Sequence, residues 1–181
     1  MRRWTTSIAA ILIAVTTVLA LASLTGQGTA WSGSRVYSAF ASAKVVDLRE
    51  NNLVDELAGL PLSVRIAKVN LDQSILSVEL KIGEKSYQPS VLYLDMAELI
   101  RFAFERTSNV SQLLIRLVAE DKWVGTKHLL LAADVRRGEW PSSALDDLEN
   151  LGDQPLSGEL KRYFRISATS LWKNRFERTD W

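Results

Sequence analysis

Hydrophobic residues follow one pattern at the N-terminus of this chain and another in the remainder. From Trp4 to Ser34 there is no charged side chain, and Ser7 to Leu24 is rich in Ile, Leu, Val and Ala. A bilayer's hydrocarbon core is about 30 Å thick and a helix rises about 1.5 Å per residue, so about 20 apolar residues can cross it. The pattern therefore predicts a membrane-targeting helix.

Residues 1–30 are consistent with either a membrane anchor or a signal peptide. Arg2 and Arg3 precede the apolar run and no Lys or Arg follows until Arg35, so the positive-inside rule predicts a cytoplasmic N-terminus. The length of the run favours an anchor, whereas small residues such as those at 20–22 would suit a cleavage site. We expect a single-pass protein of the cell membrane with its C-terminal domain outside the cytoplasm, or a secreted protein after cleavage.

Two further regions follow the targeting segment. Residues 31–44 are rich in Ser and Ala and predict a flexible tether. Residues 45–181 are enough for one extracytoplasmic domain with its own core, but not for two. The chain has no cysteine, which excludes disulfides and zinc–thiolate sites, so the apolar core must hold this domain together.

The first half of the domain shows a helical pattern and then an alternating one. Apolar residues recur near a 3.6-residue period from Val45 until Gly59 and Pro61, which predicts a helix. Residues 64–71 and 75–82 predict two strands joined by a polar turn, with a bulge near Ala67-Lys68, where the alternation changes phase.

The second half continues with alternating helical and strand patterns. A strong amphipathic helix is predicted from Pro89 to about Thr107, followed by strands over 113–117 and 129–135 that are apolar on both faces and therefore interior. A short helix is expected after Pro141-Ser142 and a final helix from Ser157 to about Lys173. The predicted fold class is α+β: a small antiparallel or mixed sheet of about four strands packed by helices, preceded by one N-terminal transmembrane or signal helix.

The order of these elements resembles that of a known family. The segments 52–61, 75–80, 99–109 and 110–118 resemble the helix, strand, helix and strand of GerMN-type and ring-building extracytoplasmic domains of bacterial sporulation and secretion membrane proteins. The resemblance implies a non-enzymatic domain that packs against copies of itself or against partners in spore or envelope assembly. It supplies no catalytic residues.

Charge and residue content exclude several classes of function. The formal net charge of +1 argues against a nucleic-acid partner. His128 is the only histidine, there is no Gly-x-Ser-x-Gly motif, and the nearby acids Glu120, Asp121 and Asp134 lack the spacing of known metal ligands. We therefore expect no metal site, no cofactor and no catalytic triad.

Acidic residues on two predicted helices leave an enzymatic alternative open. An exported glycoside hydrolase would use a pair of carboxylates. Candidates for such a pair are Asp95, Glu98, Asp146, Asp147 and Glu149. Charges of mixed sign at helical spacing are also typical of the solvated face of a helix. A cell-wall-active hydrolase, or a regulator of one, is therefore an alternative function.

The C-terminal segment interleaves basic and aromatic residues. Six basic and three acidic residues lie between Leu156 and Trp181. Candidate contacts to an anionic surface are Lys161, Arg162, Arg165, Trp172, Lys173, Arg175 and Phe176. In the alternative interpretation the aromatic rings pack on the core and the cations point to water.

Taken together, the patterns predict a binding protein rather than an enzyme. The leading hypothesis is a membrane-anchored extracytoplasmic protein-interaction domain in bacterial envelope or spore assembly. Its expected partners are the membrane, through the N-terminal helix, and other proteins or further copies of the chain. A secreted soluble binding protein is the other alternative.

Overall fold

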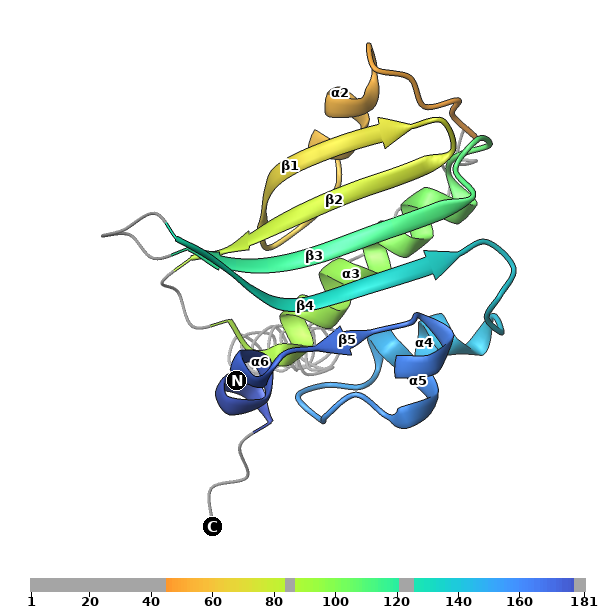
Figure 1. Cartoon of the computed structure of the whole chain (residues 1–181). Coiled ribbons are helices and arrows are strands. Elements are labelled where there is room, and N and C mark those ends of the chain that lie inside the picture. Colours follow the sequence, from red (N-terminus) through yellow and green to blue (C-terminus); the bar gives the residue numbers. More distant parts are fainter. Residues whose placement is uncertain (1–44, 84–86, 121–125, 178–181) are drawn as a thin grey trace, which may run out of the picture. The chain divides into compact units, whose positions relative to one another are not determined.

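The computed structural model describes residues 45–83, 87–120 and 126–177 (Figure 1). The predicted targeting helix and tether at 1–44 lie outside these residues. Within the described part of the chain, no helix is both long enough and apolar enough to cross a bilayer.

Five strands form one mixed sheet in the order β1-β2-β3-β4-β5. They are β1 (Arg65–Asp72), β2 (Ile75–Ile82), β3 (Gln112–Glu120), β4 (Lys127–Arg136) and β5 (Ser167–Ala168). Only β2 and β3 pair in parallel, and the other neighbours are antiparallel. The parallel pair follows from the connection: helix α3 (Pro89–Glu105) carries the chain back to the same end of the sheet before β3 begins. The predicted α+β class is confirmed, with a short fifth strand added.

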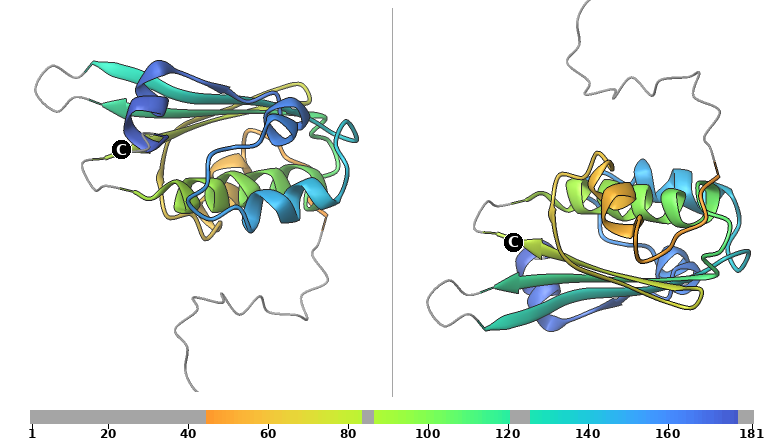
Figure 2. Two further views of the ribbon diagram at one scale, coloured as in Figure 1. Left: turned by 90° about the horizontal axis from the view of Figure 1, so that it is seen from below. Right: turned by 90° about the horizontal axis from the view of Figure 1, so that it is seen from above.

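The helices are distributed unequally around the sheet. Helices α2 (Leu53–Ala58), α3 and α4 (Ser143–Glu149) lie on one face, as both views of Figure 2 show. Helices α5 (Gly158–Tyr163) and α6 (Ser170–Phe176) lie beside the edge formed by β4 and β5. The opposite face of the sheet carries no helix of the described chain. We call it the open face.

The core lies between the sheet and α3. Residues of the covered face that are at most 1% exposed include Leu76, Val78, Leu80, Leu113, Ile115 and Leu117. Those of α3 include Leu92, Met96, Leu99 and Ile100. The alternation predicted for β2 and β3 therefore fixes which side chains face α3 and which face solvent.

Two bulges adjust the alternation. The ladder between β1 and β2 shifts register between Ile66 and Lys68, which confirms the bulge expected there. A second shift lies between Leu117 and Val118, opposite Leu129 and Leu131 of β4. Beyond it, Leu130 and His128 change sides and lie toward α6.

The first helix is shorter than its sequence pattern predicted. It begins at Leu53, because the preceding segment is held in an extended form against the loop after α3. The Val46 N–H donates to the Arg106 carbonyl at 2.9 Å, and the Ser108 N–H donates to the Val46 carbonyl at 3.0 Å. The Asn109 side-chain amide donates to the Leu48 carbonyl at 2.7 Å. These contacts over about 60 residues of sequence compete successfully with local helix formation.

The predicted final helix over 157–173 is also wrong as a single element. Helix α5 ends at Tyr163, Arg165 has a positive φ of 47°, and Ser167–Ala168 pairs with β4 as β5. Thr169 then starts α6: its hydroxyl oxygen accepts from the Trp172 N–H at 3.4 Å. The interruption places Trp172 in the core at 0% exposed and leaves Leu171 47% exposed.

Candidate functional site

Trp172, one of the candidate surface contacts, packs in the core. Its ring centroid lies 6.1 Å from that of Tyr93 and 4.5 Å from that of Phe176, and its indole N–H donates to Glu177 at 3.3 Å. Burial beside Trp172 raises the pKa of the Tyr93 hydroxyl. Trp172 therefore takes the core-packing alternative, and Phe176 is partly buried beside it.

The basic C-terminal candidates do not gather in one patch. Lys161 pairs with Glu177 at 3.8 Å, and Arg162 lies over the ring of Tyr163. Arg165 contacts Asp134, near the end of β4, whereas Arg175 lies beside His128, near its beginning. Those two β4 positions are separated by about 20 Å at the rise of a strand.

Two of the basic candidates, Lys173 and Arg175, lie on α6. Within the described residues Lys173 and Arg175 form no ion pair, although Arg175 lies over the Phe176 ring. A pocket of about 360 Å³ adjoins this helix. It is lined by Ala119, His128, Leu130, Leu171, Asn174 and Arg175.

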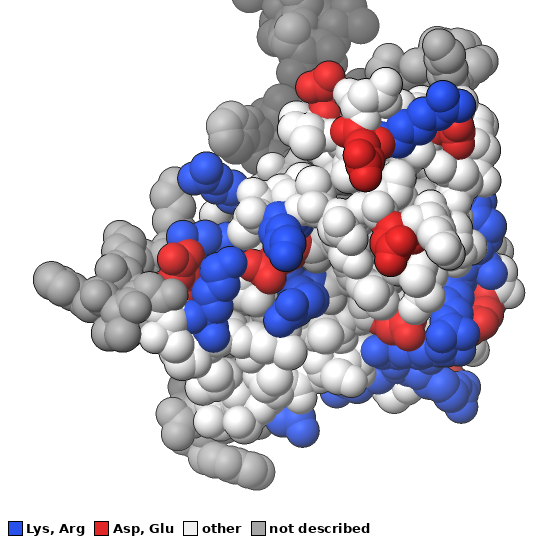
Figure 3. Space-filling view, turned by 45° about the horizontal axis from the view of Figure 1, so that its top comes forward, with Lys and Arg blue, Asp and Glu red and all other residues white. Residues whose placement is uncertain are grey.

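The open face of the sheet is the larger candidate surface. Seen in Figure 3, acidic and basic side chains are interleaved over the surface with uncharged residues between them. Leu114, Leu129 and Ala132 are partly exposed and contribute apolar area to this face. Val118 is only 2% exposed and lies apart from the main core, so the neighbouring side chains of the open face cover it.

Glu79 organises the charges at the middle of this face. It is 9% exposed and accepts a hydrogen bond from Lys127 at 2.7 Å, and its other oxygen lies 3.8 Å from Arg116. The bond to Glu79 raises the pKa of Lys127. A second ion pair joins Lys81 to Glu120, and the hydrogen bond from Lys81 lowers the pKa of Glu120. The strands thus carry fixed charges of both signs.

A shallow groove crosses strands β1, β2 and β3 on the same face. Its volume is about 410 Å³. The residues that line it are Lys68, Asn70, Ser77, Val78, Glu79, Leu114 and Arg116. Charged and polar residues thus surround the partly exposed Leu114, as a polar rim surrounds the apolar centre of many interfaces.

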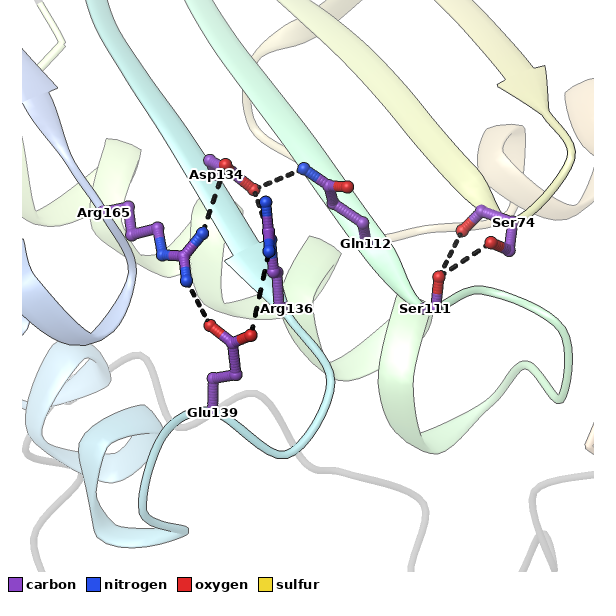
Figure 4. A network of polar contacts seen from close by, with 7 residues as sticks. All are labelled: Ser74, Ser111, Gln112, Asp134, Arg136, Glu139 and Arg165. Atoms are coloured by element: carbon purple, nitrogen blue, oxygen red, sulfur yellow. Dashed lines mark hydrogen bonds and ion pairs between the residues drawn. The ribbon is translucent and has the colours of Figure 1, made fainter.

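A polar network closes the end of the open face near the β4–α4 connection (Figure 4). Asp134 accepts from the Gln112 amide at 2.7 Å and lies 3.7 Å from Arg165. Glu139 joins Arg165 and Arg136 to the same network. Nearby, the Ser111 hydroxyl donates to the Ser74 hydroxyl at 2.7 Å, between the starts of β3 and β2. These contacts hold the side chains at this end of the open face in place.

The carboxylates considered for glycoside hydrolysis have other contacts. Asp95 is 0% exposed and accepts from the Ser63 and Val64 N–H groups. Glu98 lies 3.6 Å from Arg106, and Glu149 lies 2.6 Å from Arg101. Asp146 and Asp147 are exposed on α4. None of these five acids lines the pocket beside α6 or the groove on the open face.

His128 and the acids of the described residues form no metal-binding cluster, and Asp121 lies outside those residues. His128 is exposed at the start of β4. In residues 45–83, 87–120 and 126–177, no group of three or more His, Cys, Asp or Glu side chains is arranged to hold a metal ion.

The sequence pattern indicated the amphipathic strands of the open face. It gave no local signal for the groove, because the groove depends on pairing between strands that are distant in the sequence.

Comparison of the chain with family models, with curated proteins and with solved structures finds no significant match. The function must therefore be argued from the geometry and the sequence pattern alone.

Proposed function

We propose that this chain is a membrane-tethered extracytoplasmic domain that acts by protein association through the open face of its sheet, in assembly of a bacterial envelope or spore. The observation that carries the proposal is the one-sided sheet. Helices cover one face, and the other presents a groove of about 410 Å³ among ordered ion pairs.

The make-up of the open face supports binding to a polar, mixed-charge protein surface. Glu79 is paired with cations from two strands, and Asp134 contacts both Gln112 and Arg165. Such ion pairs hold their side chains in place. In an interface they contribute more to the orientation and choice of the partner than to the affinity. Leu114 in the groove provides apolar area for a hot spot.

The tether and the location are supported by the sequence. The uncharged run from Trp4 to Ser34, with Arg2 and Arg3 before it, is typical of a helix that delivers the remaining chain across the membrane. The resemblance of the helix and strand order to GerMN-type domains supports an assembly role.

A topology experiment tests the tether. Alkaline phosphatase fused after Trp181 in a bacterial host is expected to be active, and a green fluorescent protein fusion at the same position is expected to be dark. Reversal of both results would overturn the extracytoplasmic location. Recovery of the chain in the medium would instead indicate the secreted alternative.

A second experiment tests the open face. Arg116→Gln and Leu114→Ser change exposed or partly exposed groove residues without adding a negative charge opposite Glu79 or Asp134. Both should keep a melting temperature close to that of the parent, while site-specific crosslinking of the full chain to neighbouring proteins in intact cells is lost. Val54→Asp is a matched control, because Val54 is 63% exposed on α2, away from the groove. Unchanged crosslinking by both groove variants would contradict the proposal. A changed rate of cell-wall turnover on replacing Asp146 and Asp147 by their amides would also contradict it, because that result would favour the hydrolase alternative.

A further inference from the structure

Strand β1 is an edge strand whose outer side has no partner. It pairs with β2 only, and no other backbone hydrogen bond involves residues 65–72 within the described chain. An edge of this kind presents alternating N–H and C=O groups to which another strand can add.

Edge strands are commonly protected by bulges and lysines, and β1 has both. The bulge, however, lies between Ile66 and Lys68, at the beginning of the strand. From Lys68 to Asp72 the ladder is regular, since these five residues pair in unbroken register with Glu79 to Ile75 of β2. The bulge therefore interrupts only the first half of the edge, and Lys68, the lysine of β1, lies at the start of the regular half.

We propose that two copies of this chain associate edge to edge through antiparallel pairing of Lys68–Asp72, with a twofold axis at Asn70. In this register Lys68 of one copy faces Asp72 of the other, Val69 faces Leu71, and Asn70 faces Asn70. A twofold axis repeats each contact, so the Lys68–Asp72 charge pair and the Val69–Leu71 apolar pair each form twice. The inference rests on the proposed binding role and names a second copy as one partner.

The charges favour this register. Lys68 and Asp72 are both exposed, and neither forms an ion pair within the described part of the chain. Both lie on the open face, because they pair with Glu79 and Ile75 in the ladder while Val78 and Leu76 point to the core. Opposite charges placed directly across an antiparallel pair stabilise it, and like charges destabilise it.

The apolar residues favour the same register. Val69 and Leu71 face the core but remain partly exposed, because they lie at its margin. Pairing would place each against its counterpart and bury the exposed part of both. Five residues make a small contact, so tethering of both copies to one membrane is needed to raise their effective concentration.

Disulfide trapping tests the pairing in the full chain, which has no cysteine of its own. Directly opposed residues of an antiparallel pair have Cα atoms about 4.5–5.5 Å apart, within the range of a disulfide. Asn70→Cys in isolated membranes is therefore expected to form a covalent dimer on mild oxidation. Ser77→Cys is the control: Ser77 pairs with Asn70 one strand further in, and its two copies would lie about 14 Å apart.

Charge exchange makes the test specific for the register. In the Asn70→Cys background, Lys68→Asp and Asp72→Lys should each lower the rate of dimer formation roughly fivefold, because two like-charge pairs form per dimer. The double exchange restores the pairs and should restore the rate. Each variant is first shown to melt like the parent, since both sites are exposed.

Equal trapping of the Asn70→Cys and Ser77→Cys chains would overturn the inference, as would failure of the double exchange to restore trapping. These outcomes are separate from failure of the proposed function. If Arg116→Gln loses crosslinking to neighbouring proteins and Asn70→Cys forms no covalent dimer, the chain is an interaction domain without edge pairing.

Discussion

The Asp95 carboxylate of α3 accepts a hydrogen bond from the Val64 N–H at 2.7 Å and a second from the Ser63 N–H at 2.9 Å. Asp95 is 0% exposed, and its bond to Val64 is buried, whereas its bond to Ser63 is partly buried. They hold the segment that precedes β1 against the middle of α3. A carboxylate that the sequence offered as a catalytic acid thus has a structural role.

Asp95→Ala is expected to lower the free energy of unfolding by about 2–3 kcal/mol, because the Val64 N–H is left buried without its acceptor. Denaturation by urea, followed by circular dichroism, measures the change. Asp147→Ala removes an exposed carboxylate of α4 and should stay within about 0.5 kcal/mol of the parent. Equal stability of the two variants would show that the interior bonds contribute little.

Neighbouring residues of β2 allow a direct test of its two faces. Val78 is 1% exposed and faces α3, whereas Ser77 is partly exposed on the open face. Val78→Asp places an unpaired charge in the core and should cost more than about 4 kcal/mol, enough to unfold many domains of this size. Ser77→Asp should leave a cooperative melting transition near that of the parent. Cooperative melting of Val78→Asp at the parent temperature would contradict the assignment of the covered face.

The elements predicted best from sequence are those in which a local pattern and the tertiary contacts agree. In β2 the alternation of Leu76, Val78 and Leu80 matches a sheet with one covered face, and the expected bounds match the observed ones. Helix α3 was also predicted well, because Pro89 is suited to its first turn and its apolar stripe faces the sheet.

The errors occurred where distant contacts decide the backbone. Leu160, Phe164, Ala168 and Leu171 fit one helical stripe, yet pairing of Ser167–Ala168 with β4 interrupts the helix. Val46 likewise fits a helix but bridges to Thr107, 61 residues away. The groove on the open face depends on the parallel pairing of β2 with β3, which no local pattern specifies.

Arg137 stabilises the carboxyl end of α3, where helical carbonyl groups lack intrahelical partners. Its guanidinium donates to the carbonyl oxygens of Ala103, Phe104, Thr107 and Val110 at 2.6–3.1 Å. Arg137→Lys keeps the charge but not the planar set of donors, and should cost about 1–2 kcal/mol. Arg136→Lys, a change at the exposed neighbouring residue, should cost less than about 0.5 kcal/mol. Thermal unfolding of the two variants measures the difference, and equal melting temperatures would argue against this role.

Asp153 provides a test of pH dependence at the other end of α3. Its carboxylate accepts from the Ser90 N–H at 3.1 Å, and hydrogen bonds from the Ser90 hydroxyl and backbone hold the pKa of Asp153 below its ordinary value of 3.8. Because the pKa is lowered in the folded state, the stabilisation is present at pH values above the ordinary pKa and is lost as the pH falls through the lowered pKa.

Asp153→Asn removes the titration. Its melting temperature should therefore lie below that of the parent near pH 6, and the difference should shrink as the pH falls through the lowered pKa of the parent carboxyl. Asp147→Asn is the matched control, since within the described residues Asp147 forms no hydrogen bond or ion pair through its side chain. A difference between Asp153→Asn and the parent that stays constant across this range would show that the Ser90 contact does not depend on the charge of Asp153.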